Sequence, residues 1–300
     1  MISPFISSRH RDRLNILIQT TISSAVDDWA IARFSKLVAL VKSQPGLHVI
    51  ARDREPGNVP DSVLSTIDAS DIDVLFLMAV DTGDGLHASE CAAMERFRQR
   101  GGGLLLARDH MDIGSSLYSL AMVGQAHHFH SKNQERDAQR HVNDDVVTAS
   151  IRWPNYHSGR NGDHQDVTVS GPEIHPVLLN PASPTGAIRF FPAHPHEGAI
   201  SAPTNQMARV IATGRSRVSS ASFNLVVAFE SHAGMGRALA HSSFHHFADY
   251  NWDSAAGCPG FVSEVPGHGM ANNPDAITDI SRYVVNAATW LAGDGQTVSN

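Results

Sequence analysis

Apolar residues in the first 125 positions follow two patterns that alternate along the chain. Short, nearly continuous apolar runs are typical of strands buried on both faces. These runs lie at residues 14–18, 47–51, 73–80 and 104–107. Between and after them, apolar residues three or four positions apart predict helices near residues 30–41, 91–97 and 113–123. The alternation predicts an α/β fold, with a parallel sheet and helices on both faces.

Regular patterns return after residue 222. Strands are expected at residues 224–230 and 237–241, and apolar positions from Ile277 to Leu291 form one face of a closing helix. Residues 126–222 differ, because they are rich in His, Asn, Pro and Gly and offer only brief strands at 167–169 and 208–212. We therefore expect residues 1–300 to form one domain, with 126–222 as an irregular, His-rich insertion packed over the sheet.

Composition and charge narrow the classes of partner. The chain has 300 residues, 42% of them hydrophobic, and a net charge of -7 without any basic run. Nucleic acid and membranes are therefore poor partners, and no apolar stretch approaches the ~20 residues that span a bilayer. Two cysteines fit a reducing cytoplasm and exclude a Cys-rich zinc site. No nucleotide-binding motif follows a strand, so no nucleotide cofactor is expected. The partner that we expect is therefore a small-molecule substrate. The sequence does not decide whether the chain forms a homo-oligomer.

Histidine changes this picture, because 18 of the 300 residues are His and many stand beside acids. Imidazole titrates near neutral pH and is the commonest metal ligand in proteins. The strings that join His to an acid, or to further His, lie at 109–112, 127–130, 163–164, 194–197 and 245–249. Such strings at loop positions predict a polar site that can bind a metal ion.

The first string follows the strand at 104–107. Asp109, His110 and Asp112 would lie at the carboxyl end of a parallel strand, where open α/β sheets bind their ligands. A carboxylate beside an imidazole can hold a metal or act as a base with its orienting partner, so all three are candidate catalytic residues. The alternative is that one of the two acids caps a helix beginning near Ile113.

The string from His194 to Glu197 has the spacing of an extended metal-binding segment. His194 and His196 point the same way in extended chain, and Pro195 argues against a helix. With His246 they form the expected metal-ligand set, and Glu197 is a candidate catalytic acid or base. The alternative is a surface loop whose histidines only form hydrogen bonds.

Two further strings supply candidates. In a helix, His245 and Asp249 share one face, which makes both candidate catalytic residues. The alternative for the acid is a buried structural partner that fixes a histidine tautomer. A polar, Gly-punctuated loop, either a solvated loop or one that closes over a substrate, supplies the candidate substrate-binding residues His157, Arg160, Asp163 and His164.

The two halves that flank the insertion resemble the class I glutamine amidotransferase-like fold, a flavodoxin-like architecture, and most closely its ThuA-like (trehalose utilisation) branch. The resemblance rests on the strand 73–80 with the following Gly101–Gly103 turn, on the Gly236–Ala240 segment that leads into histidines, and on the helix that ends near Ala292. It covers roughly residues 12–125 and 222–292.

The resemblance also implies a nucleophilic cysteine in the turn that follows the strand ending at Ala107. Here that turn reads Arg108-Asp109-His110, and Cys91 lies in the preceding helix. A glutaminase triad is therefore excluded. The Asp-His-x-Asp turn, together with the later His-His-x-x-Asp, also resembles a group of uncharacterised bacterial proteins.

The leading hypothesis is a metal-dependent hydrolase acting on a small polar substrate. A divalent ion, zinc or iron by ligand type, would activate water while a spare Glu or His moves protons. The first alternative is a metal-free acid/base enzyme acting on a carbohydrate or lactone, in keeping with the ThuA-like resemblance. The second is a ligand-binding module that lost its nucleophile. The distances between the clusters discriminate among the three.

Overall fold

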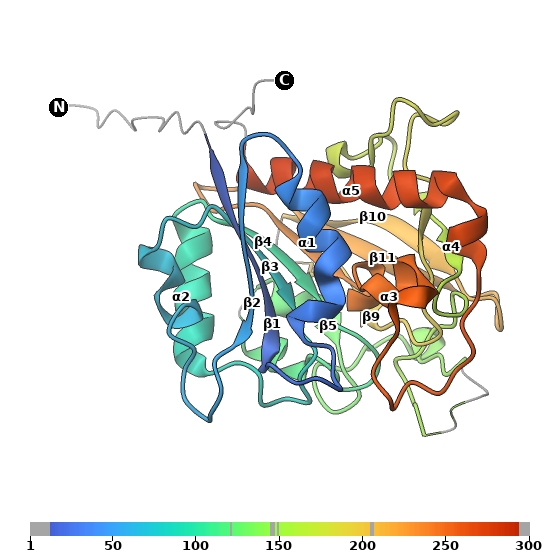
Figure 1. Cartoon of the computed structure of the whole chain (residues 1–300), viewed down its shortest axis with the longest axis horizontal. Helices are drawn as coiled ribbons and strands as arrows, with labels where there is room; N and C mark the ends of the chain where they lie inside the picture. The colour runs from blue at the N-terminus through green and yellow to red at the C-terminus, as the bar shows by residue number, and fades with distance from the viewer. Residues whose placement is uncertain (1–12, 121, 145–147, 149, 205–206, 294–300) are drawn as a thin grey trace.

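A computed structural model describes residues 13–120, 122–144, 148, 150–204 and 207–293, and its centre is an eight-stranded sheet (Figure 1). The strand order across the sheet is β2-β1-β3-β4-β12-β11-β10-β7. In that order the strands are β2 (Leu47–Arg54), β1 (Leu14–Ser23), β3 (Val74–Met78), β4 (Gly103–Ala107), β12 (Ala238–His241), β11 (Ser222–Phe229), β10 (Ala208–Arg215) and β7 (Thr168–Val169). The expected α/β fold is confirmed.

The sheet is mixed rather than parallel throughout. The first five strands of the order pair in parallel, and their order is that of a flavodoxin-like sheet. The last three pair antiparallel. The reason lies in the connections: residues 216–221 and 230–237 are too short for a parallel crossover but sufficient for hairpins.

Helices cover both faces of the sheet. Side chains alternate along β3, so that Val74, Phe76 and Met78 join one apolar cluster while Leu75 and Leu77 join the other. The first cluster also contains α1 (Ser35–Lys42) and α5 (Pro274–Ala292), which lie in front of the strands in Figure 1. The second contains α2 (Ala88–Gln99). Burial on both faces explains the continuous apolar runs.

Short elements make up much of the rest. They are α3 (Asp249–Trp252), α4 (Gly269–Asn272), the paired strands β5 (His127–His128) and β9 (Ala199–Ile200), the paired strands β6 (His164–Asp166) and β8 (Phe190–Pro192), and 3-10 turns at Ile31–Phe34, Leu64–Ala69, Ser115–Ser119, Gly124–Ala126, Ala138–Arg140, Pro176–Leu178, Phe244–His246 and Ser254–Ala256.

The helix predicted over residues 113–123 is wrong for the part that the structure describes, which excludes residue 121. This stretch contains the 3-10 turn Ser115–Ser119 instead. Gly114 has a left-handed φ of 76°, and the Asp81 carboxylate accepts hydrogen bonds from the backbone and hydroxyl of Ser116. These contacts favour a tight turn over a continuous helix.

The two brief strands expected within residues 126–222 correspond to β7 and β10, and both belong to the central sheet, so this range is not only an insertion packed over it. The other described residues of this range form the small paired strands, short 3-10 turns and long coil. Among the described residues, no helix is both long and apolar enough to cross a membrane.

Candidate functional site

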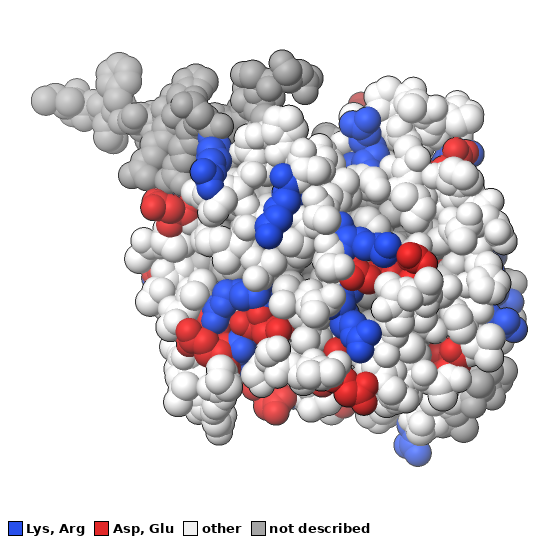
Figure 2. Space-filling view, viewed as in Figure 1, with Lys and Arg blue, Asp and Glu red and all other residues white. Residues whose placement is uncertain are grey.

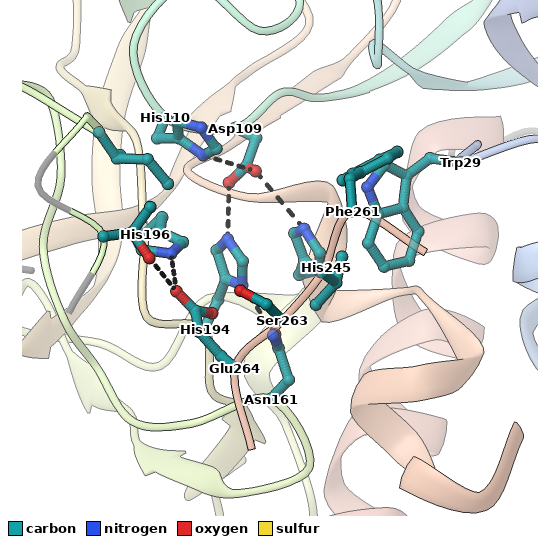
Figure 3. Close-up of a pocket in the computed structure, with 13 residues that line it drawn as sticks. Trp29, Asp109, His110, Asn161, His194, His196, His245, Phe261, Ser263 and Glu264 are labelled. Carbon is teal, nitrogen blue, oxygen red and sulfur yellow. Dashed lines mark hydrogen bonds and ion pairs between the residues drawn. The ribbon is translucent and has the colours of Figure 1, made fainter. Parts of the chain in front are cut away.

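A cavity of about 110 Å³ opens beyond the carboxyl ends of β4 and β12 (Figure 3). The turn after β4 places Asp109 and His110 on its wall, and the turn after β12 places His245 there. The coil between β8 and β9 adds His194 and His196. The other lining residues are Trp29, Thr148, Ile151, Asn161, Phe261, Val262, Ser263 and Glu264.

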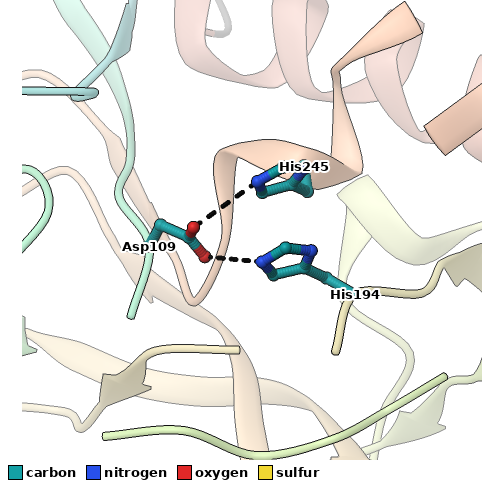
Figure 4. A group of neighbouring side chains, drawn as sticks. All are labelled: Asp109, His194 and His245. Atoms are coloured by element: carbon teal, nitrogen blue, oxygen red, sulfur yellow. Dashed lines mark ion pairs between the residues drawn. The ribbon is translucent and has the colours of Figure 1, made fainter. Parts of the chain in front are cut away.

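One buried carboxylate and two imidazoles converge in this cavity (Figure 4). Asp109 Oδ1 lies 3.2 Å from His194 Nε2, and Asp109 Oδ2 lies 3.4 Å from His245 Nε2. All three side chains are buried. One ligand atom from each lies within 4.8 Å of those from the other two, so the group could hold a metal ion.

A chain of asparagines determines which nitrogen of each imidazole carries the proton. The backbone carbonyl of Ala193 can only accept a hydrogen bond, so the Asn251 side-chain atom that faces it must be the amide nitrogen. This nitrogen donates at 2.8 Å to that carbonyl and to Asn161 Oδ1. Asn251 Oδ1 then faces His245 Nδ1 at 2.9 Å, and Asn161 Oδ1 faces His194 Nδ1 at 2.9 Å. Both Nδ1 atoms therefore donate, and in the neutral rings both Nε2 atoms present lone pairs to Asp109.

Two nitrogen lone pairs are thus directed at the Asp109 carboxylate. Because like charges repel, each contact is stable only with a proton or a cation between the nitrogen and the oxygen. Burial lowers the pKa of His194 well below its ordinary 6.5, despite the opposing effect of Asp109. Burial alone would raise the pKa of Asp109, but His194, His110 and His245 in their protonated forms outweigh it and lower that pKa well below 3.8. A neutral imidazole beside a charged carboxylate is the protonation state that binds a metal ion.

The separations also suit a metal ion. Two ligand atoms about 2.0–2.1 Å from a tetrahedral ion lie roughly 3.3 Å apart, close to the observed 3.2 and 3.4 Å. The His194 and His245 rings are stacked, with centroids 3.6 Å apart and planes at 10°. An ion midway between the Nε2 atoms would lie out of both ring planes. Binding is therefore expected to rotate the rings apart.

A third imidazole in the cavity is held in the same way. The carbonyl of Ile151 fixes the Asn155 amide nitrogen at 3.3 Å, and Asn155 Oδ1 lies 3.4 Å from His196 Nδ1. His196 Nε2 lies 2.7 Å from Glu264 Oε1. Burial would raise the pKa of Glu264, but His196 outweighs it, so that pKa is lowered. The cavity thus holds a second imidazole–carboxylate pair beside the first group.

Of the residues predicted from the sequence, the structure brings Asp109, His110, His194, His196 and His245 together on the cavity wall. His110 Nδ1 lies 3.0 Å from Asp109 Oδ2. This histidine is therefore part of the same group.

Glu197 and His246 pair with each other behind the cavity. Both are fully buried, and His246 Nε2 lies 3.1 Å from Glu197 Oε1. Glu197 also accepts hydrogen bonds from Ser158 Oγ at 3.0 Å, Gln165 Nε2 at 2.6 Å and Ser242 Oγ at 2.8 Å. The structure therefore places His246 at a carboxylate and not beside His194 and His196. Neither Glu197 nor His246 lines the cavity.

Asp112 and Asp249 also lie outside the cavity lining. Each accepts hydrogen bonds from the backbone of another segment. Asp112 Oδ1 accepts from the backbone and hydroxyl of Ser131 at 3.0 and 2.9 Å. The Asp249 carboxylate accepts from the backbone nitrogens of Ser35 and Lys36 at 2.9 and 2.7 Å, which is the first turn of α1. Asp249 thus caps a helix far away in the sequence.

The residues predicted to bind substrate, His157, Arg160, Asp163 and His164, are absent from the cavity lining. Arg160 is exposed, and Asp163 Oδ1 accepts from the backbone of Gly269 at 3.0 Å. The same loop contributes Asn161, which does line the cavity and holds His194.

Sequence reasoning missed Trp29, Asn161, Asn251 and Glu264. The Trp29 indole meets the His245 ring edge-on, with centroids 4.6 Å apart. The only signal for Asn161 was its place in a His-bearing loop, and Glu264 has no neighbouring histidine in the sequence. No cysteine belongs to the described cavity lining, and burial raises the pKa of Cys91 in α2 to about 12.

Comparison with known proteins identifies the architecture. No family model and no curated protein matches the chain. A crystal structure of a protein described as ThuA-like from Parabacteroides merdae ATCC 43184 matches with a TM-score of 0.52 at 13% identity, covering 96% of this chain and 92% of that one. Another, from Bacteroides uniformis ATCC 8492, matches with a TM-score of 0.47 at 12% identity. The first of these matches shows that the chain has the fold of a ThuA-like protein.

Proposed function

We propose that this protein is a metal-dependent hydrolase acting on a small polar substrate, with a divalent ion held by Asp109, His194 and His245. One observation carries the proposal: two imidazoles, each with its Nδ1 proton committed to an asparagine oxygen, direct Nε2 at one buried carboxylate. Partners that fix the tautomer in this way are typical of metal-ligating histidines.

The donor set points to zinc or iron(II). Catalytic zinc sites use three protein ligands from His and carboxylate and keep a further position open. Iron(II) takes the same two-His, one-carboxylate set. The ion would supply Lewis-acid activation of a water molecule. His110, 3.0 Å from Asp109 and on the cavity wall, is placed to accept and return a proton.

The cavity supports a small substrate. Its volume of about 110 Å³ lies well below the roughly 300–1,000 Å³ of pockets for drug-sized ligands. Among the described residues, its lining contains no Lys or Arg, whereas Trp29 and Phe261 add aromatic surface. On the face shown in Figure 2, Lys and Arg lie beside Asp and Glu, without a continuous basic area. A small molecule remains the partner that this surface fits best.

Metal dependence tests the proposal. The protein purified without chelator should contain zinc or iron, and removal of the ion should abolish hydrolysis of a panel of small esters, amides and lactones until metal is restored. Asp109→Asn and His194→Ala should lose the ion. Asp112→Asn is the matched control, because its carboxylate contacts Ser131 outside the cavity lining and its loss should leave metal content unchanged. A folded protein that ignores both metal and chelator would contradict the proposal.

The Asp109–His110 pair supports a second candidate, a metal-free acid/base enzyme acting on a carbohydrate or lactone. A carboxylate 3.0 Å from an imidazole nitrogen can orient that ring as a general base. This candidate predicts activity with a bell-shaped pH profile that chelators leave intact.

A further inference from the structure

The cavity contains a further imidazole–carboxylate contact that the proposed metal site does not use. His196 Nε2 lies 2.7 Å from Glu264 Oε1 and faces the same cavity as Asp109 (Figure 3). The Asn155 amide nitrogen donates to the Ile151 carbonyl, so it is Asn155 Oδ1 that faces His196 Nδ1, at 3.4 Å. At 2.7 Å the contact between His196 Nε2 and Glu264 Oε1 is a hydrogen bond, in which Nε2 donates a proton to the carboxylate.

All three units therefore share one design, in which an asparagine oxygen holds Nδ1 and a carboxylate faces Nε2. The first two units share Asp109, whereas the third has a carboxylate of its own. Partners of this kind orient an imidazole for a metal ion and raise its basicity. A divalent cation that displaces the proton of the hydrogen bond between His196 and Glu264 would gain both side chains as ligands, so the third unit is a second place for a cation.

The third unit is close to the first site. The His196 ring centroid lies 5.3 Å from that of His194 and 5.2 Å from that of His110. Hydrolases with two metals hold their ions about 3.5–4 Å apart, so neighbouring imidazoles at this spacing can serve two ions. The Glu264 side chain is 17% exposed, which leaves it accessible to an incoming ion.

We infer that the cavity binds a second divalent cation through His196 Nε2 and Glu264, next to the ion at Asp109, His194 and His245. The inference rests on the proposed metal site and extends it to a pair of ions. With only two protein ligands, the second position binds more weakly than the first, and water completes its coordination.

Titration of metal-free protein with Mn²⁺ and Zn²⁺ tests this inference. Calorimetry should give two ions per chain, one tight and one weak, and the Mn²⁺ form should show the spin coupling of neighbouring ions in its EPR spectrum. Glu264→Gln and His196→Ala should each reduce the count to one ion and abolish the coupling, while the tight site keeps its affinity. Asp253→Asn is the control, since this acid pairs with Lys36 outside the cavity lining and should leave both ions bound.

The other outcomes are distinguishable. One ion per chain, unchanged by Glu264→Gln, overturns the second site and leaves the proposed function standing. Two ions that persist in both variants overturn the assignment to His196 and Glu264. Binding of no ion overturns the second site and the proposed function together. If His196→Ala does not fold, Glu264→Gln decides the question, because it removes the charge and keeps the shape.

Discussion

At the scale of single residues, the informative contact is an asparagine behind each histidine. Asn251 donates to a backbone carbonyl and to Asn161, and through these bonds the tautomers of His245 and His194 are set. The sequence could not reveal this relay, because 90 positions separate the two asparagines and neither adjoins the histidine that it holds. The histidines were predictable from their clustering, but the residues that orient them were not.

Replacing Asn251 should weaken metal binding without removing a ligand. In Asn251→Ala, His245 loses its acceptor and Asn161 its donor, so both Nε2 atoms lose their fixed orientation. A loss of about 10–100-fold in metal affinity is expected, measured by competition with a chromophoric chelator. Asn180→Ala is the control, because this buried asparagine donates to Asp279 and does not line the cavity. Equal affinities for the two variants would refute the relay.

At the scale of elements, periodicity predicted the strands well, but it did not predict that β11 and β7 run antiparallel to their neighbours. The alternation of apolar runs and helical faces could not show that β10, β11 and β12 connect through short hairpins. The helix expected after Asp112 failed because Gly114 and Asp81 impose a turn, and the decisive contact crosses from the segment after β3. Local patterns capture an element's type, whereas contacts between segments decide its partner and its ends.

Glu197 is the carboxylate that ties the ligand-bearing segments together. It bonds Ser158, whose hydroxyl also accepts from the backbone of His194 at 2.9 Å, and it bonds Ser242 and His246 on the segment of His245. Glu197 was a candidate in the sequence because it follows His194 and His196. In the structure its hydrogen bonds hold the backbone segments that carry His194 and His245.

Glu197→Gln should therefore lower both stability and metal affinity. The amide puts an NH2 group where a carboxylate oxygen accepted hydrogen bonds, so a buried donor loses its acceptor at a cost of about 1–3 kcal/mol. Loosened ligand segments add a loss of metal affinity. Asp279→Asn is the matched control: this buried acid accepts from Asn180, Arg189 and Phe190. It should destabilise the fold in urea while metal affinity measured on the folded protein stays unchanged. A drop in stability alone for both variants would show that Glu197 does not position the site.

At the scale of the whole molecule, buried histidines make the fold sensitive to acid. Burial lowers the pKa of His127 and of His241 well below 6.5. Below about pH 6.5 these two histidines bind protons in the unfolded chain but stay neutral in the folded protein. The free energy of unfolding therefore falls as pH decreases. Each histidine contributes a slope of at most about 1.4 kcal/mol per pH unit, and above that pH the contribution levels off.

His127→Leu should flatten this dependence. Within the described part of the chain, neither ring nitrogen of His127 has a hydrogen-bond partner. Its replacement should reduce the fall in urea-unfolding free energy between pH 7 and pH 5, measured with chelator present. His268→Ala removes an exposed histidine and serves as the control, with the wild-type slope expected. An unchanged slope for His127→Leu would contradict this account of acid sensitivity.

The sequence predicted part of the candidate site but not all of it. The carboxyl edge of the sheet was predictable, and so were Asp109 and His245, because both follow strands that end there. His246 was expected at the metal and instead meets Glu197, since adjacent residues in the turn after β12 point to different sides. Glu264 enters from a distant loop, which no local pattern signals.

The most direct test of the central claim is a crystal structure of the zinc-loaded protein with anomalous scattering data. An ion is expected about 2.0–2.2 Å from His194 Nε2, His245 Nε2 and an Asp109 oxygen, with the two rings turned out of their stacked arrangement. Crystals grown in excess zinc that show the rings still stacked at 3.6 Å and no anomalous peak at Asp109 would contradict it.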